Sequence, residues 1–142
     1  MRSTIFVIAA ALAFSLSGIA LACSCRPLAD AAEHAANSDA IFRGSVIASI
    51  PDPARPDFFS ITTFQIIAPL KWPSGWDAPP ETIEVRHASA QNGPHCAIWY
   101  EPATTALVVA RVGQDRLLHT SSCDAPRWPE ADYRAALHLA AN

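Results

Sequence analysis

Residues Ala40–Ile50 read AIFRGSVIASI, an apolar segment rich in β-branched residues. This composition predicts a strand, and Gly44 inside the segment predicts a bend or a bulge. Phe58–Leu70, FFSITTFQIIAPL, predicts a second and longer strand. The Pro-rich segment Pro51–Asp57 lies between them and predicts a turn, so the two strands are expected to form the arms of a hairpin.

Three further strands are expected downstream. Glu81–Ala88 alternates between apolar and charged side chains, which predicts a half-buried strand. Thr104–Val112 and Arg116–Ser121 are expected to be strands on either side of a tight turn at Gly113–Asp115. Trp72–Pro80 is rich in Pro and Trp, and it is expected to be a loop.

Short helices are expected on both sides of the strands. Apolar residues recur at helical spacing in Leu28–Asn37, and Pro129–Ala141 has Pro at an N-terminal helical position. The apolar stripe of this second helix consists of Tyr133, Ala136, Leu137 and Leu139. The order of elements predicts an all-β fold with short flanking helices, built as a small five-stranded Greek-key barrel. A β-sandwich is the alternative architecture.

Residues 1–22 have the composition of a secretory signal peptide. Arg2 is their only charged residue, an apolar run follows it, and Ala20-Leu21-Ala22 forms an A-x-A cleavage site. Cleavage there would leave residues 23–142 as one domain in a secreted or periplasmic location. An uncleaved membrane anchor is one alternative, and a lipoprotein signal is another, because a cysteine follows the small residues directly. After cleavage no segment is long and apolar enough to cross a bilayer.

The four cysteines are Cys23, Cys25, Cys96 and Cys123, an even number that predicts two disulfides in an exported chain. A bond between Cys23 and Cys25 would close a very tight loop, so each is expected to reach one of the distant pair. Two pairings then remain open. Lipidation of Cys23 would leave one cysteine without a partner. Zinc binding by the four cysteines is a competing interpretation.

The charge and the motifs of the chain argue against several classes of function. The chain has 10 Lys and Arg against 13 Asp and Glu, which argues against a nucleic-acid partner. Its five histidines show no metal-ligand spacing, no G-x-S-x-G motif is present, and all cysteines can be paired. The sequence therefore predicts neither an enzyme nor a cofactor. Trp72, Trp76 and Trp99 could form an aromatic ligand face or cover an end of the barrel.

Removal of residues 1–22 would place Cys23-Ser24-Cys25-Arg26-Pro27, a C-x-C-x-P sequence, at the N-terminus. The distant cysteines and several strand segments accompany it, namely Ser38–Val46, Thr63–Ile67, Ala106–Ala110 and Leu117–Thr120. Together these features resemble the N-terminal, inhibitory domain of the tissue inhibitors of metalloproteinases, a netrin-like version of the OB-fold. The resemblance reaches to about Asp124 and is that of a bacterial-type, single-domain homologue.

The resemblance implies a five-stranded OB-fold barrel with the bridges Cys23–Cys96 and Cys25–Cys123. The chain also departs from the family pattern. It lacks the third bridge of the family's N-terminal domain and the second, Cys-rich subdomain. The short turn Pro51–Asp57 stands where some members have a long hairpin that they use against their targets. These departures concern the inhibitory activity more than the barrel.

In this family, the N-terminal amine and carbonyl of the first cysteine chelate the catalytic zinc of a target protease. Carried over, these atoms belong to Cys23. Ser24 would enter the specificity pocket beside the zinc, and the next residues would run along the substrate groove. The implied inhibitory wedge consists of Cys23, Ser24, Cys25, Arg26, Pro27, Pro94 and His95.

The expected function is therefore that of a secreted, monomeric, metalloprotease-inhibitor-like protein whose partner is a zinc metalloprotease. The alternative is an envelope or extracellular OB-fold module that binds a protein without inhibiting a protease. In that case the C-x-C sequence only ties down the N-terminus of the domain.

Overall fold

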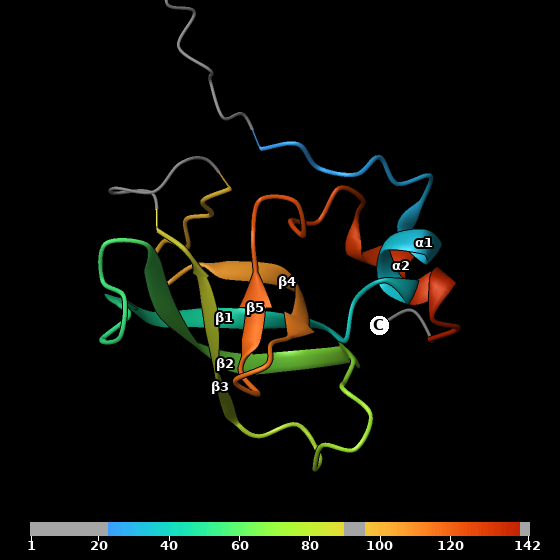
Figure 1. Ribbon diagram of the computed structural model, residues 1–142. Coiled ribbons are helices and arrows are strands. Elements are labelled where there is room, and N and C mark those ends of the chain that lie inside the picture. The colour runs from blue at the N-terminus through green and yellow to red at the C-terminus, as the bar shows by residue number, and fades with distance from the viewer. Residues whose placement is uncertain (1–22, 90–95, 140–142) are drawn as a thin grey trace, which may run out of the picture.

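The computed structural model describes residues 23–89 and 96–139, whose arrangement is shown in Figure 1. The strands are β1 (Ala40–Pro51), β2 (Phe59–Lys71), β3 (Thr82–Ala88), β4 (Thr105–Val112) and β5 (Leu118–Thr120), and the helices are α1 (Ala31–Ala36) and α2 (Glu130–Ala136). The expected signal peptide, residues 1–22, lies outside the described residues. Within the described residues, neither helix has the length and apolar character that a membrane crossing needs.

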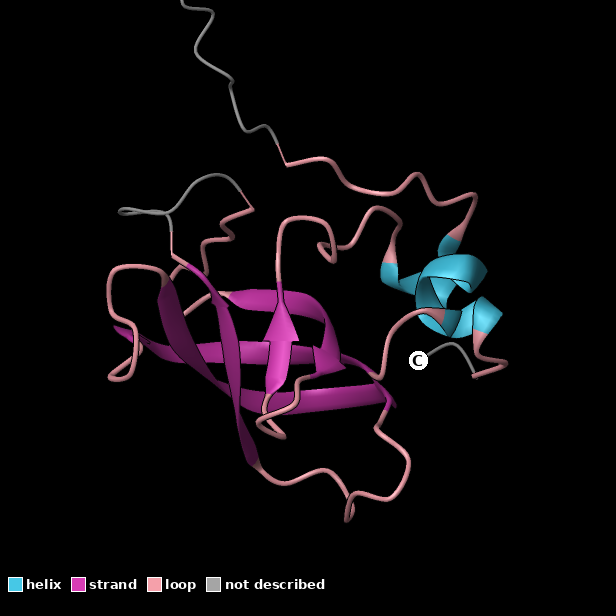
Figure 2. Ribbon diagram, in the orientation of Figure 1, coloured by secondary structure: helices cyan, strands magenta, loops and turns pink. Residues whose placement is uncertain are grey.

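The five strands close into one barrel in the order β1-β2-β3-β5-β4, with β4 paired back to β1 (Figure 2). Neighbouring strands are antiparallel except β3 and β5, which are parallel. The first half of β1 pairs with β4 on one side and with β2 on the other, which allows the sheet to close on itself. The expected five-stranded barrel is confirmed, and the described strands do not form the two stacked sheets of a sandwich.

Both faces of the first part of β1 are buried. Successive side chains of a strand point to opposite sides, so Phe42 enters the barrel and Ile41 faces away from it. Inside, Phe42 packs edge-on against Phe64, and Phe64 against Tyr100, with ring centroids 5.7 and 4.9 Å apart. Ile41 belongs to a second apolar cluster, which includes Tyr133 and residues of both helices. The continuous apolar run at the start of β1 reflects these two cores.

Gly44 lies at an irregularity of β1, as the sequence predicts. The pairing of β1 with β2 shifts register between Arg43 and Gly44. A Cβ atom at residue 44 would lie 3.1 Å from the ring of Phe42 and 3.2 Å from the carbonyl oxygen of Gln65. The absence of a side chain therefore lets the two strands approach closely at the bend.

The first helix is shorter than the sequence predicts. It begins at Ala31 rather than at Leu28, because the side chain of Asp30 accepts a hydrogen bond of 2.8 Å from Glu33 N and caps the helix there. The residues before Asp30 are consequently free to follow an irregular path from the cysteines to the helix (Figure 1).

Two elements near the C-terminus are also shorter than expected, and left-handed residues explain both. α2 ends at Ala136, and His138 then has a φ of 56°. Leu139, expected in the apolar stripe of this helix, is exposed. β5 begins at Leu118 rather than at Arg116, because Arg116 has a φ of 62° and belongs to the preceding turn.

Candidate functional site

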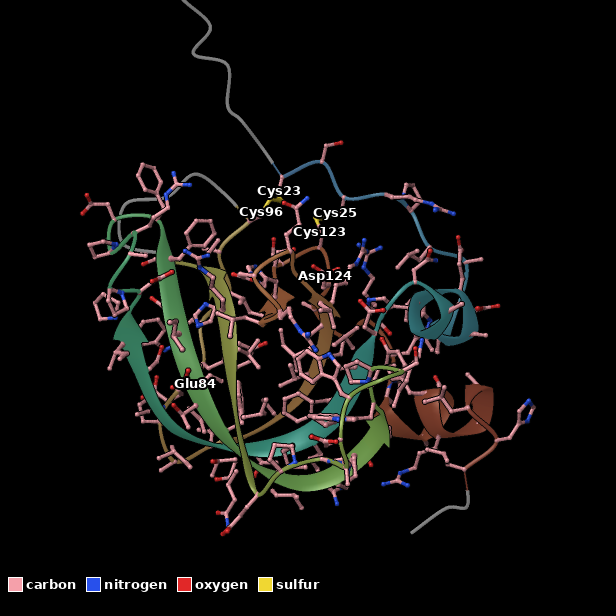
Figure 3. All side chains as sticks on the ribbon, turned by 60° about the horizontal axis from the view of Figure 1, so that its bottom comes forward. Cys23, Cys25, Glu84, Cys96, Cys123 and Asp124 are labelled. Atoms are coloured by element: carbon pink, nitrogen blue, oxygen red, sulfur yellow. A yellow bond between two sulfur atoms is a disulfide. The ribbon has the colours of Figure 1, made fainter. Side chains whose placement is uncertain are left out.

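Two disulfides tie the N-terminal segment to one end of the barrel (Figure 3). Cys23 is bonded to Cys96, which precedes β4, and Cys25 is bonded to Cys123, which follows β5. The paired Cα atoms are 5.3 and 5.1 Å apart, within the usual range for a disulfide. This is the pairing that the family resemblance implies, whereas the cysteine spacing by itself leaves the crossed pairing open.

Cys23–Pro27 form a segment without regular secondary structure, called here the N-terminal ridge. A hydrogen bond of 3.2 Å runs from Cys25 N to Cys23 O. The two cysteines are half-buried, whereas the other three side chains of the ridge are exposed. The bridges therefore hold alternate residues of the ridge against the barrel and leave the side chain between them accessible to a partner.

The loop after β5 connects the two bridges. Ser122 N donates a hydrogen bond of 3.0 Å to Cys96 O, so the segments that carry the two distant cysteines lie side by side. The loop itself is closed by a hydrogen bond of 2.8 Å from Ser121 Oγ to the carboxylate of Asp124. The sequence predicts a strand end at Ser121 and a bridge at Cys123 but not this turn, although Ser and Asp are residue types that stabilise such turns.

Arg26 directs the ridge toward α1. Its Nη2 atom lies 2.6 Å from Glu33 Oε1, and the other carboxylate oxygen of Glu33 accepts a hydrogen bond of 2.8 Å from Ala29 N. The side chain of Arg26 is 72% exposed, so this pair is expected to contribute less than about 1 kcal/mol to stability. Its effect is to orient the chain between the ridge and the helix while the guanidinium stays accessible.

A cavity beside the ridge has no free charge with which to bind an ion. Its volume is about 160 Å³, and it is lined by Arg26, Leu28, Asn37, Arg111 and Cys123. Both arginines already have a carboxylate partner among the described residues, Glu33 for Arg26 and Asp124 for Arg111.

Three cysteine sulfurs lie close together, but in this arrangement they are not a metal site. The Sγ atoms of Cys23, Cys25 and Cys123 are within 4.8 Å of one another. Each of these cysteines is in a disulfide, and no cysteine is free. A disulfide sulfur lacks the thiolate charge with which zinc is bound. The observed pairing therefore favours two structural bridges over zinc binding by the four cysteines.

The implied inhibitory wedge is described only in part. Its first five residues, Cys23, Ser24, Cys25, Arg26 and Pro27, lie together in the ridge. The other two, Pro94 and His95, lie outside the described residues. In the uncleaved chain the nitrogen of Cys23 belongs to a peptide bond, and removal of residues 1–22 would convert it into an amine with a lone pair to donate.

The three tryptophans considered as one aromatic face do not lie together. Trp72 and Trp76 pack against the barrel core and contact each other edge-on, with ring centroids 6.0 Å apart. Trp99 is 60% exposed, donates a hydrogen bond to Glu101, and does not line the cavity beside the other two. Trp72 and Trp76 thus help to cover one end of the barrel, and a cavity remains open next to them.

No protein-family model matches the chain, and no curated protein matches its sequence. The barrel and the two bridges are features of the structure itself.

Proposed function

We propose that the protein is a secreted, metalloprotease-inhibitor-like protein whose N-terminal ridge binds the catalytic zinc of a target protease. One observation carries the proposal. The ridge Cys23–Pro27 is accessible, while disulfides at Cys23 and Cys25 hold it on a closed barrel. A segment held in this way can enter a substrate groove with little loss of conformational freedom, which favours binding.

The zinc of a metalloprotease has three protein ligands and a water molecule in its open position. After removal of residues 1–22, the amine nitrogen and the carbonyl oxygen of Cys23 would together replace that water. The carbonyl oxygen accepts the hydrogen bond from Cys25 N and retains a second lone pair for the metal. Ser24 would enter the pocket beside the zinc, and Arg26 and Pro27 would follow the groove. Pro27 adds rigidity because it fixes its own φ.

The two disulfides indicate an oxidising environment, extracellular or periplasmic. In such a compartment, cleavage after Ala22 would release the protein and create the Cys23 amine in one step. The bridge from Cys23 to Cys96 also occupies the sulfur atom that a lipoprotein would use for its lipid. The proposal therefore takes the mature protein to be a free monomer with an unmodified N-terminus.

The test compares a protein that begins at Cys23 with one that carries an additional Ala before it. Hydrolysis of a fluorogenic peptide by a panel of zinc metalloproteases is measured with each form. The form beginning at Cys23 is expected to inhibit at least one enzyme, and the extended form to be weaker by about 100-fold or more, because an amide nitrogen has no lone pair to donate. Intact mass and thermal unfolding are the controls that both forms carry two disulfides and the same fold.

Equal inhibition by the two forms would contradict zinc chelation by the amine. No inhibition across the panel would favour the alternative of an extracellular binding module, in which the bridges only fix the N-terminus.

A further inference from the structure

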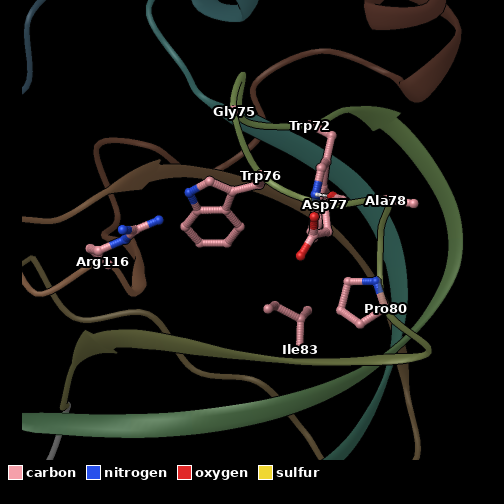
Figure 4. Close-up of a pocket in the computed structure, with 8 residues that line it drawn as sticks. All are labelled: Trp72, Gly75, Trp76, Asp77, Ala78, Pro80, Ile83 and Arg116. Carbon is pink, nitrogen blue, oxygen red and sulfur yellow. Dashed lines mark hydrogen bonds between the residues drawn. The ribbon is translucent and has the colours of Figure 1, made fainter.

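A second site lies at the end of the barrel opposite to the ridge. β3 and β5 run parallel, and the bridged Cys123 follows the end of β5. The loop before β3 and the turn before β5 therefore meet at the other end of the barrel (Figure 1). Between them is an open cavity of about 400 Å³, within the usual range for small-molecule sites. Its main lining residues are Trp72, Trp76, Asp77, Pro80, Ile83 and Arg116 (Figure 4).

The tryptophans give this cavity a fixed aromatic wall. Trp72 packs edge-on against Phe42 of the core, with centroids 6.4 Å apart, and its indole N–H donates a hydrogen bond of 2.9 Å to the backbone oxygen of Asp77. Trp76 stands at 78° to Trp72 and is half-buried. Because Trp72 is held by both the core and the loop, it gives the ring of Trp76 a fixed neighbour to pack against.

Three polar groups around this wall have no partner in the described part of the chain. They are the indole N–H of Trp76, the carboxylate of Asp77 and the guanidinium of Arg116, and all three residues line the cavity. Each of the other described arginines contacts a carboxylate, a backbone oxygen or an aromatic ring. The cavity is thus lined by two hydrogen-bond donors and one acceptor that have no partner among the described residues.

Arg116 adopts a strained backbone conformation at the cavity, and this conformation costs conformational free energy. The turn is closed by hydrogen bonds from Gly113 N to Leu117 O (2.8 Å) and from Arg116 N to Gly113 O (3.0 Å). Arg116 has a φ of 62° in this turn, a conformation that hairpins commonly assign to Gly and that costs other residues about 1 kcal/mol. Strained residues cluster at ligand sites, and here the strained residue carries one of the two cavity charges that have no partner among the described residues.

We propose that this cavity binds a neutral carbohydrate. The apolar face of a pyranose ring would stack on Trp76, and its hydroxyl groups would accept hydrogen bonds from Arg116 and donate one to Asp77. Figure 4 shows Arg116 and Asp77 on opposite sides of the Trp76 ring, which suits a ligand with hydroxyl groups all round its rim. The site lies apart from the ridge, so this inference does not rest on the proposed inhibition.

Other ligand classes fit the same groups less well. An anionic ligand would meet the carboxylate of Asp77, and a cationic one the guanidinium of Arg116, so the opposite charges favour a neutral molecule. A proline-rich peptide could lie on the tryptophans, but its prolines have no N–H to donate to Asp77. A sugar hydroxyl both donates and accepts, and it is therefore able to satisfy each of the three unpartnered groups.

The experiment titrates the protein with maltotriose, cellotriose and tri-N-acetylchitotriose, and follows tryptophan fluorescence and the heat of binding. Saturable binding of at least one of these sugars is expected. No saturation by any of them up to about 10 mM would overturn the proposal. Tighter binding of a nucleoside or of an oligoproline peptide in the same cavity would also overturn it.

Arg116→Gly and Ala103→Gly form a matched pair of variants. Both replace a left-handed residue, with φ values of 62° and 61°, but Ala103 does not line the cavity. Arg116→Gly is expected to weaken sugar binding about tenfold or more without lowering the unfolding temperature, because the backbone strain is relieved as the guanidinium is lost. Ala103→Gly is expected to bind as the wild type does. Unchanged binding by Arg116→Gly, or an equal loss in both variants, would overturn the assignment.

The form with an additional Ala before Cys23 separates this site from the ridge. It is expected to bind the sugar with unchanged affinity whether or not it inhibits a protease. A loss of sugar binding in that form would contradict the placement of the carbohydrate at the opposite end of the barrel.

Discussion

His34 and His87 are both almost fully buried, and each makes a hydrogen bond to a neutral hydroxyl group. His34 Nδ1 lies 2.7 Å from Tyr133 Oη, and His87 Nε2 lies 2.7 Å from Thr62 Oγ1. Burial lowers the pKa of both histidines below the usual value, because the charged imidazolium loses its hydration inside the protein. These two residues therefore link the packing of the fold to pH.

The direction in which stability changes with pH depends on the pKa of each histidine in the folded and in the unfolded protein. The pKa of each histidine is lower in the folded than in the unfolded protein, so the unfolded chain takes up protons first as the pH falls through about 6.5. The free energy of unfolding is expected to fall below that pH, by up to about 1.4 kcal/mol per pH unit for each histidine. This change in the free energy of unfolding is measured by urea denaturation at several pH values between about pH 8 and pH 5.

Substitution of single histidines shows which of them causes the pH dependence of stability. His34→Gln is expected to reduce the slope of stability against pH, whereas the same substitution at the exposed His138 should leave it as in the wild type. A stability that stays constant or rises on acidification through this range would contradict the assignment of the two buried residues.

Among the elements, β3 contacts two of the loops that connect other strands, and it does so through the side chain of Arg86. Its guanidinium forms an ion pair with Asp52, in the loop after β1, and lies 3.3 Å from Asp115, in the turn between β4 and β5. It also stacks 4.5 Å from the ring centroid of Phe59. The carboxylate of Asp52 is almost fully buried, so its charge depends on this partner.

Arg86→Met keeps an extended side chain on β3 but leaves the charge of Asp52 buried without its partner. A loss of about 3 kcal/mol in the free energy of unfolding is expected, measured by urea denaturation. The double variant with Asp52→Asn should recover part of that loss, because it removes the isolated charge. Arg26→Met, at an exposed ion pair, is the control and should cost less than about 1 kcal/mol. A double variant no more stable than Arg86→Met would show that the buried charge is not the cause.

The elements also show which parts of this fold are readable in the sequence. The sequence predicts β1, β2 and β3 to within one residue at each end, because their apolar runs are long and Pro-rich segments separate β1 from β2 and β2 from β3. The start of β5 and the end of α2 are not predicted correctly. Arg116 and His138 interrupt these elements with a left-handed backbone, a conformation that is uncommon for any residue but Gly and that a single Arg or His does not place in a sequence, although His is enriched in it.

The two candidate sites also differ in how far the sequence reveals them. The ridge is recognisable because its five residues are consecutive, although the pairing of its cysteines is not fixed by their spacing. The sequence offers Trp72 and Trp76 for an aromatic ligand face, but it does not predict the polar groups of the cavity, because Asp77 and Arg116 lie in separate loops and meet only when β3 and β5 pair. Unused hydrogen-bonding groups are a property of contacts, and contacts between distant segments cannot be read from one sequence.

In the molecule as a whole, the ridge and the cavity lie at opposite ends of one barrel and depend on different parts of it. The ridge is held by two disulfides, whereas the cavity is built from connections of the strands. A change that loosens the ridge should therefore leave the cavity intact, provided that the barrel still folds.

Removal of the second bridge tests this separation. Cys25→Ser combined with Cys123→Ser opens a link between residues 98 positions apart and keeps the bond between Cys23 and Cys96. The loop-entropy model gives a loss of about 4 kcal/mol, measured by thermal or urea unfolding. Protease inhibition should weaken as well, because the residues after Cys23 then have to become ordered on binding. Sugar binding at the other end should persist.

Each result of that comparison has a distinct physical meaning. Weaker inhibition with unchanged sugar binding would mean that the second bridge preorganises the ridge. Lower stability with unchanged inhibition would mean that the bridge acts only by restricting the conformations of the unfolded chain. The bond between Cys23 and Cys96 would then be enough to hold the ridge in its binding conformation. An equal loss at both ends would mean that the barrel depends on the bridge, in which case the two sites are not independent. Closure of the barrel by β1 and β4, which involves neither cysteine, argues for the first of these results.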